Sequence, residues 1–126
     1  MTHQQNAPVF LNLFRIRMPA GAVASIAHRI SGVLLFLSLP LLAWLLDLSL
    51  QGGEGYKRAI ALLQSTGVRL ASVVLVWSLL HHLVAGIRFL LIDVHFGVSM
   101  PAARLSAWFA NLAAVLMALL YAWWVL

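Results

Sequence analysis

Three long stretches of this chain contain no charged side chain, and they constrain the possible fold more than any other feature. They lie between Arg29 and Asp47, between Arg69 and Arg88, and from Leu105 to Leu126. Each approaches the roughly 20 apolar residues that cross the hydrocarbon core of a bilayer as one helix. The sequence therefore predicts an all-α membrane protein with three transmembrane helices, at about 21–48, 68–93 and 104–126. We expect a single domain over residues 1–126, which begins with an N-terminal segment at 1–20.

Composition supports a membrane protein and argues against several soluble classes. Of the 126 residues, 63% are hydrophobic and 9% are charged, and a soluble bundle with three such stretches would have almost no polar face. The eight basic residues stand near the ends of the apolar stretches, so we expect no nucleic acid partner. The chain has no cysteine and therefore no thiolate ligand for an iron–sulfur cluster. The "GGEG" at 52–55 lacks the pattern and context of a dinucleotide-binding fingerprint.

The basic residues are distributed unevenly about the predicted helices. The N-terminal segment, the start of the first helix and the connection between the second and third helices hold five of them, and the other side holds three. The five are Arg15, Arg17, Arg29, Arg88 and Arg104, and the three are Lys57, Arg58 and Arg69. Because cytoplasmic loops are enriched in Lys and Arg, this distribution predicts a cytoplasmic N-terminus.

A histidine inside the second predicted helix indicates a bound haem. Arg88 is expected near the inner interface, and His82 lies six residues earlier, which places its imidazole about 9 Å deeper. A neutral imidazole can ligate haem iron, a small residue such as Gly86 can admit the porphyrin, and His28 with Arg29 can neutralise the propionates. We therefore predict haem b, with His82 as an axial ligand of its iron.

The neighbouring histidine cannot supply the opposing ligand. His81 and His82 are consecutive, and consecutive helix residues diverge by about 100° from one backbone. His28 lies near the interface, where contact with a propionate suits it better. We therefore expect the second axial ligand from a partner chain, which makes this chain part of a two-subunit helix bundle that shares the haem. The alternative for a histidine in a membrane helix is a hydrogen bond to a neighbouring helix.

Ser25 and Arg29 indicate a second kind of site at the start of the first helix. They are four residues apart and share a helix face. A hydroxyl and a fixed cation suit the carbonyl of a lipid-soluble quinone as it acquires electrons and protons. Each has a simpler interpretation, since Ser25 can bond to the carbonyl four residues earlier and Arg29 can extend to lipid headgroups. Their pairing on one turn favours a quinone site.

Several segments together resemble the family of succinate dehydrogenase cytochrome b556 subunits, the larger membrane anchors of respiratory complex II. They are "PVFLNLFRIRMP" before the first helix, "SIAHRISGV" at its start, and "HxxxGIR" followed by Asp93 in the second helix. The resemblance implies a heterotetramer in a bacterial inner membrane, with a flavoprotein subunit, an iron–sulfur subunit and a second small anchor. Electrons from succinate would reach ubiquinone, with no flavin or iron–sulfur cluster in this chain.

The resemblance also implies roles for individual residues. His82 matches the haem ligand, and the other axial histidine belongs to the second anchor. Ser25 and Arg29 match the quinone-site pair, and His28 and Arg29 match residues near the haem propionates. The family also has apolar residues that line the quinone pocket, and these positions are Leu13, Met18 and Ile26 here.

The chain departs from that family at two positions, and other functions remain open. Phe89 stands where relatives have a second histidine, and Met18 stands where an aromatic residue is familiar. One alternative is the anchor of a fumarate reductase that uses menaquinone. Another is a small non-redox transporter or assembly protein, in which Arg29 and His82 would line a proton path.

Overall fold

The computed structural model describes residues 18–126, and this part of the chain forms four helices and no strand. The helices are α1 (Ala20–Leu50), α2 (Gly52–Gln64), α3 (Thr66–Asp93) and α4 (Met100–Val125). Three of them, α1, α3 and α4, are long and apolar enough to cross a membrane. The predicted all-α class with three transmembrane helices is therefore confirmed.

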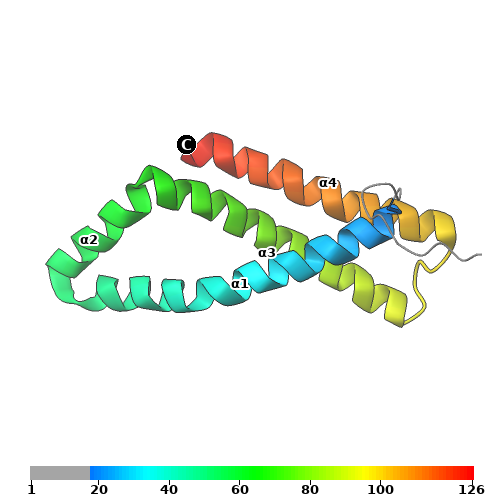
Figure 1. The fold of residues 1–126 in the computed structure, drawn as a ribbon, viewed down its shortest axis with the longest axis horizontal. Coiled ribbons are helices and arrows are strands. Elements are labelled where there is room, and N and C mark those ends of the chain that lie inside the picture. Colours follow the sequence, from blue (N-terminus) through cyan, green and yellow to red (C-terminus); the bar gives the residue numbers. More distant parts are fainter. Residues whose placement is uncertain (1–17) are drawn as a thin grey trace, which may run out of the picture.

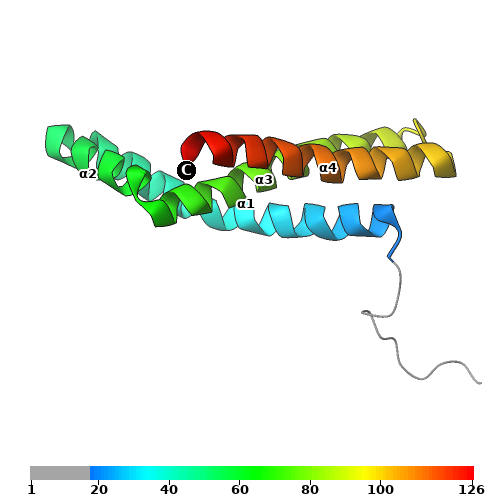
Figure 2. The same ribbon diagram turned by 90° about the horizontal axis from the view of Figure 1, so that it is seen from above.

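The three long helices run in alternating directions. Figure 1 shows that α1 and α3 cross near their middle and that α4 lies along α3, and Figure 2 shows the same arrangement from above. The start of α1, the end of α3 and the start of α4 lie at one end of the molecule, which we call the α3–α4 end. The short helix α2 joins α1 to α3 at the opposite end. The start of α1 and the connection at 94–99 therefore lie on the same side of the membrane.

Helix α2 lies between the first two predicted transmembrane helices, at about 21–48 and 68–93. Gly52 has a φ of +85°, a conformation that favours glycine, where the chain turns out of α1. A β-carbon at Gly55 would collide with the Leu48 carbonyl oxygen. These two glycines let the polypeptide turn sharply and begin a new helix at once.

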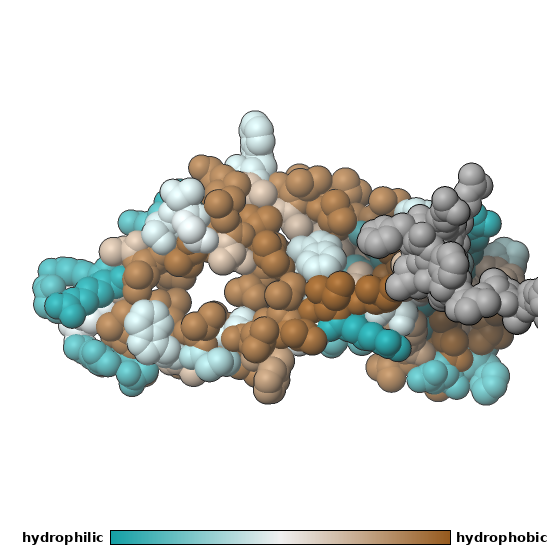
Figure 3. Space-filling model, in the orientation of Figure 1, coloured by the Kyte–Doolittle hydropathy of each residue, from teal (hydrophilic) through white to brown (hydrophobic). Residues whose placement is uncertain are grey.

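Small side chains form the contacts between the long helices. The buried residues of α4 recur at helical spacing, and they are Ala107, Ala110, Ala114 and Ala118. Ala20 and Ala24 of α1 pack against the first of these alanines. Small residues let membrane helices approach closely, because lipid tails offer no hydrophobic drive for larger side chains to be buried. Large apolar side chains instead cover the outside, where Figure 3 shows a mainly hydrophobic surface over the helices.

Three hydrogen bonds between pairs of side chains also link α3 to α4 at successive depths. Ser72 Oγ lies 3.0 Å from the Tyr121 hydroxyl, and Arg88 Nε donates to Ser106 Oγ at 2.9 Å at the α3–α4 end. The third bond joins His81 to α4 between these two levels. Polar contacts of this kind contribute to helix association in a bilayer and fix the register of the two helices.

Candidate functional site

His82 lies at the crossing of α1 and α3, and its hydrogen bonds define its tautomer. Its Nδ1 is 3.1 Å from the His28 carbonyl oxygen and 3.2 Å from Ser31 Oγ. The Ser31 hydroxyl donates to the same carbonyl at 2.8 Å, so its oxygen is left to accept. Because a carbonyl oxygen can only accept, the proton of a neutral His82 is on Nδ1. The lone pair is then on Nε2, which is the atom a metal would take.

The two imidazoles at this crossing stack on each other. The ring centroids of His28 and His82 are 4.1 Å apart and their planes differ by 9°. Phe89 meets the His28 ring edge-on, with centroids 5.4 Å apart. We call His28, Ser31 and His82 the imidazole cluster.

Two glycines make room for these rings. A β-carbon at Gly32 would lie 3.0 Å from His82 Cε1, and one at Gly86 would lie 3.4 Å from His28 Nε2. The sequence singled out Gly86 as the residue that admits a porphyrin beside His82. In the structure Gly86 lies against His28, and the glycine against His82 is Gly32. Sequence reasoning missed both Gly32 and Ser31.

His81 points away from this cluster, toward α4. Its side chain is buried, its Nε2 lies 3.0 Å from Asn111 Oδ1, and its ring is 5.4 Å from that of Trp77. His81 therefore makes a hydrogen bond to a neighbouring helix, the arrangement expected as the alternative to haem ligation for a histidine in a membrane helix. Within residues 18–126, His81 Nδ1 and Asn111 Nδ2 are buried and have no partner. The two histidines face different helices, as the divergence of consecutive residues requires.

Ser25 and Arg29 lie on α1 one turn apart, and the described part of the chain leaves them unengaged. Ser25 is half-buried and Arg29 is exposed. Several serines bond back to a carbonyl of their own helix, as Ser31 and Ser38 do. Among residues 18–126, Ser25 makes no such bond and Arg29 forms no ion pair. Arg29 lines a shallow groove of about 250 Å³ with apolar neighbours on α1.

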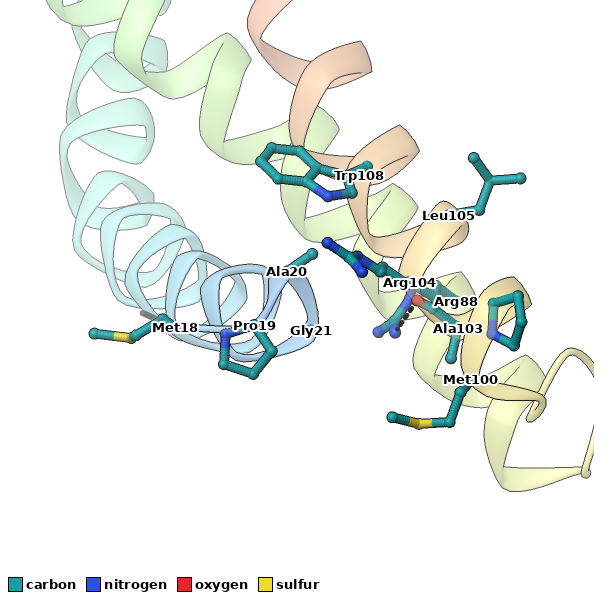
Figure 4. Close-up of a pocket in the computed structure, with 11 residues that line it drawn as sticks. Met18, Pro19, Ala20, Gly21, Arg88, Met100, Ala103, Arg104, Leu105 and Trp108 are labelled. Atoms are coloured by element: carbon teal, nitrogen blue, oxygen red, sulfur yellow. Dashed lines mark hydrogen bonds between the residues drawn. The ribbon is translucent and has the colours of Figure 1, made fainter. Parts of the chain in front are cut away.

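The expected apolar lining of the quinone pocket is represented by two described residues. Met18 and Ile26 are 42% and 43% exposed. Leu13 lies outside the described residues. A larger cleft, of about 1030 Å³, opens between the starts of α1 and α4 (Figure 4). It shares Met18 with the expected lining, whereas Ser25, Ile26 and Arg29 do not line it.

The arrangement offers a metal one nitrogen ligand and no complete coordination sphere. Within residues 18–126, no three side chains of His, Cys, Asp or Glu come together as metal ligands. A protein-bound metal ion commonly takes three or four such ligands. An iron that is already held by a macrocycle needs only axial ligands from the protein. The cluster suits the second case.

Comparisons with known proteins match nearly the whole chain. Residues 3–121 match the family model for the succinate dehydrogenase/fumarate reductase transmembrane subunit. The succinate dehydrogenase cytochrome b556 subunit of Coxiella burnetii is 40% identical over 102 residues, 80% of this chain and 82% of that protein. The subunit of the same name from Paracoccus denitrificans is 30% identical over 105 residues, 81% and 78% of the two chains. That of Rickettsia felis is 28% identical over 110 residues, 87% and 84%.

Proposed function

The chain belongs to the succinate dehydrogenase/fumarate reductase transmembrane subunit family and is a membrane anchor subunit of the succinate dehydrogenase complex, and we propose that it holds haem b and part of a ubiquinone-reduction site. The relatives carry the name cytochrome b556 subunit, which denotes a b-type haem in those proteins. In this proposal His82 ligates the haem iron, and Ser25 and Arg29 bind the quinone. Oxidation of succinate belongs to other subunits of the complex.

The hydrogen bonding of His82 Nδ1 to α1 is the single observation that carries the haem assignment. Metal-ligating histidines usually donate their second ring nitrogen to a carbonyl or carboxylate, which fixes the tautomer and orients the ring. The His82 Nδ1–H has two acceptors on α1, the His28 carbonyl and Ser31 Oγ, so Nε2 is left for iron. A haem bound there supplies a one-electron redox centre. The residues present therefore fit the group.

The surroundings of His82 support this assignment. The stacked His28 ring limits rotation of the His82 imidazole, and His28 with Arg29 would meet the haem propionates at the α3–α4 end. The second half of α1 presents large apolar side chains with little cover, among them Phe36 at 71% and Leu41 at 67% exposed. We propose that the second small anchor packs there and brings the opposing axial histidine, so that the haem is shared.

Ser25 and Arg29 have the chemistry that a quinone headgroup requires. Arg29 would hold and polarise a quinone oxygen through its guanidinium, and the Ser25 hydroxyl would donate a hydrogen bond to it or help to convey a proton. Met18, Ile26 and Leu13 would supply apolar lining. The assignment of Ser25 and Arg29 is supported by the fact that no residue of the described chain engages the Ser25 hydroxyl or the Arg29 cation. The site would be completed by the iron–sulfur subunit, which receives electrons from the flavoprotein subunit.

The distribution of charge supports the proposed orientation in the membrane. The start of α1 and the α3–α4 connection lie at the same end, and in the sequence the N-terminal segment, the start of α1, the end of α3 and the start of α4 hold five of the eight basic residues. The positive-inside bias then supports a cytoplasmic N-terminus in a bacterial inner membrane. The quinone pair at the start of α1 would lie at the cytoplasmic side, where the iron–sulfur and flavoprotein subunits would bind.

A reduced-minus-oxidised visible spectrum of the purified complex tests this function. We expect a b-type haem band, and a colourless complex would contradict the proposal and favour a non-redox transporter or assembly protein. Extraction of the bound quinone distinguishes the proposed function from the closer alternative, the anchor of a fumarate reductase. Ubiquinone supports the proposed direction, whereas menaquinone alone favours the anchor of a fumarate reductase.

A further inference from the structure

Arg88 is a buried cation whose described neighbours include no acid. Arg88 is only 9% exposed. Nε donates to Ser106 Oγ and one terminal nitrogen donates to the Ala103 carbonyl, each at 2.9 Å, and the guanidinium lies 5.1 Å from the centre of the Phe89 ring. Every one of these partners is neutral. Among residues 18–126 there is one ion pair, between Lys57 and Glu54, and it does not involve Arg88.

Because no described residue supplies a negative charge to Arg88, we expect its counter-charge to come from outside the described chain. Hydrogen bonds to neutral groups solvate a guanidinium in part, but a buried charge without an opposite charge is unfavourable. The cost is greater in a membrane, where intramembrane cations almost always pair or face a polar cavity. Arg88 lines the cleft between the starts of α1 and α4, so the cleft is where an anion can reach it.

The lining of the cleft combines two cations with apolar walls. Arg88 and Arg104 line it, and none of the described residues that line it is acidic. Figure 4 shows the two arginine side chains extending from α3 and α4 toward the start of α1. The other large lining side chains are apolar and include Met18, Met100, Leu105 and Trp108. An occupant should therefore have a compact negative group and a hydrocarbon portion.

We propose that this cleft binds an anionic glycerophospholipid, with its phosphate between Arg88 and Arg104 and its acyl chains along Leu105 and Trp108. Guanidinium groups form paired, charge-assisted hydrogen bonds with phosphate oxygens. The first turn of α4 contains no acidic residue, so its positive dipole end adds to the attraction. Basic pockets between transmembrane helices at the cytoplasmic side are suited to anionic headgroups.

The geometry distinguishes this lipid from the other proposed ligands. Arg88 bonds to α4, whereas His82, the residue that would hold the haem, bonds to α1. The cleft excludes Ser25 and Arg29, which carry the quinone assignment. A free phosphate could use the same two guanidinium groups but would gain nothing from the apolar walls.

The test uses the purified succinate dehydrogenase complex after detergent removal of its lipids. Phosphatidylglycerol, phosphatidylcholine, inorganic phosphate or a short-tailed ubiquinone is titrated, and bound molecules are counted by native mass spectrometry. Wild type should bind one phosphatidylglycerol tightly, and Arg104→Gln should weaken that binding by about tenfold. The matched control is Arg58→Gln, an exposed arginine on α2 at the opposite end, which should bind phosphatidylglycerol like wild type.

Several results would overturn the lipid site. They are equal binding of phosphatidylcholine, equally tight binding of inorganic phosphate, displacement of phosphatidylglycerol by the ubiquinone, or wild-type affinity in Arg104→Gln. Arg88→Lys keeps the charge but loses the two-pronged donor, so it should bind phosphatidylglycerol more weakly than wild type. Its visible spectrum and subunit content report separately whether the complex is assembled.

Discussion

A β-carbon added at Gly32 would lie 3.0 Å from Cε1 of His82, so the backbone of α1 packs directly against that imidazole. Atoms of real side chains rarely come so close, and one of the two groups would have to move. The same turn of α1 supplies the His28 carbonyl and Ser31 Oγ that hold His82 Nδ1. The position and the tautomer of His82 are therefore set by one turn of the facing helix.

Gly32→Ala should displace His82 and weaken haem binding. Because support from groups around a metal ligand typically contributes 10- to 100-fold in affinity, we expect at least about tenfold faster loss of haem. The measurement is the haem content per purified complex during incubation with a haem-binding apoprotein. Gly67→Ala is the control, since an added β-carbon there meets nothing within 4 Å. Equal haem retention in the two variants would refute the steric role of Gly32.

Ser31→Ala should weaken the hold on His82 without creating a clash. Ser31 and Ser38 are both buried and both donate to the carbonyl three residues earlier. Only Ser31 of this pair contacts His82. We expect Ser31→Ala to speed haem loss by about tenfold and to shift the haem midpoint potential, while Ser38→Ala behaves like wild type. Indistinguishable potentials in the two variants would exclude a tuning role for Ser31.

Ser25→Ala should separate the two half-reactions of the complex. If its hydroxyl serves the quinone, the rate of ubiquinone reduction should fall by about 100-fold. Succinate oxidation with a soluble dye should continue at the wild-type rate. Ser49→Ala, an α1 serine near the opposite end that bonds back to Leu46, should leave both rates unchanged. Parallel loss of both activities in Ser25→Ala would indicate damage to assembly and contradict the quinone role.

Asn111→Ala should loosen the contact between α3 and α4 and spare the haem. It leaves the buried Nε2 of His81 without its partner, which costs about 1–3 kcal/mol. The melting temperature of the complex should fall while the visible spectrum stays unchanged. Leu112→Ala, which truncates an exposed side chain of α4, should have a smaller effect. Full recovery is expected when His81 and Asn111 are both replaced by leucine, because no polar group is then left unpaired.

The transmembrane helices could be predicted from the sequence because a membrane-spanning helix depends on one local property, the length of an uncharged stretch. Their ends were harder to place. Helix α4 begins at Met100 and contains Pro101 in its first turn, since that position needs no backbone donor. The sequence interpretation began this helix after the proline. The formation of helix α2 depends on the turn at Gly52 and the close approach at Gly55.

The candidate site could be predicted only where residues lie on one helix. The pairing of Ser25 with Arg29 and the divergence of His81 from His82 follow from helical spacing. Contacts between helices depend on the crossing point, which no short pattern encodes. For that reason Ser31, Gly32 and Asn111 were missed, although each touches a histidine that the sequence had singled out.

The most direct test of haem ligation compares the adjacent variants His82→Gln and His81→Gln in the purified complex. Reduced-minus-oxidised spectra and redox titration should show the wild-type band and potential in His81→Gln, whose side chain faces Asn111 on α4. In His82→Gln that wild-type signature should be lost. An unchanged band and potential in His82→Gln, or the same loss in both variants, would contradict ligation of the haem by His82.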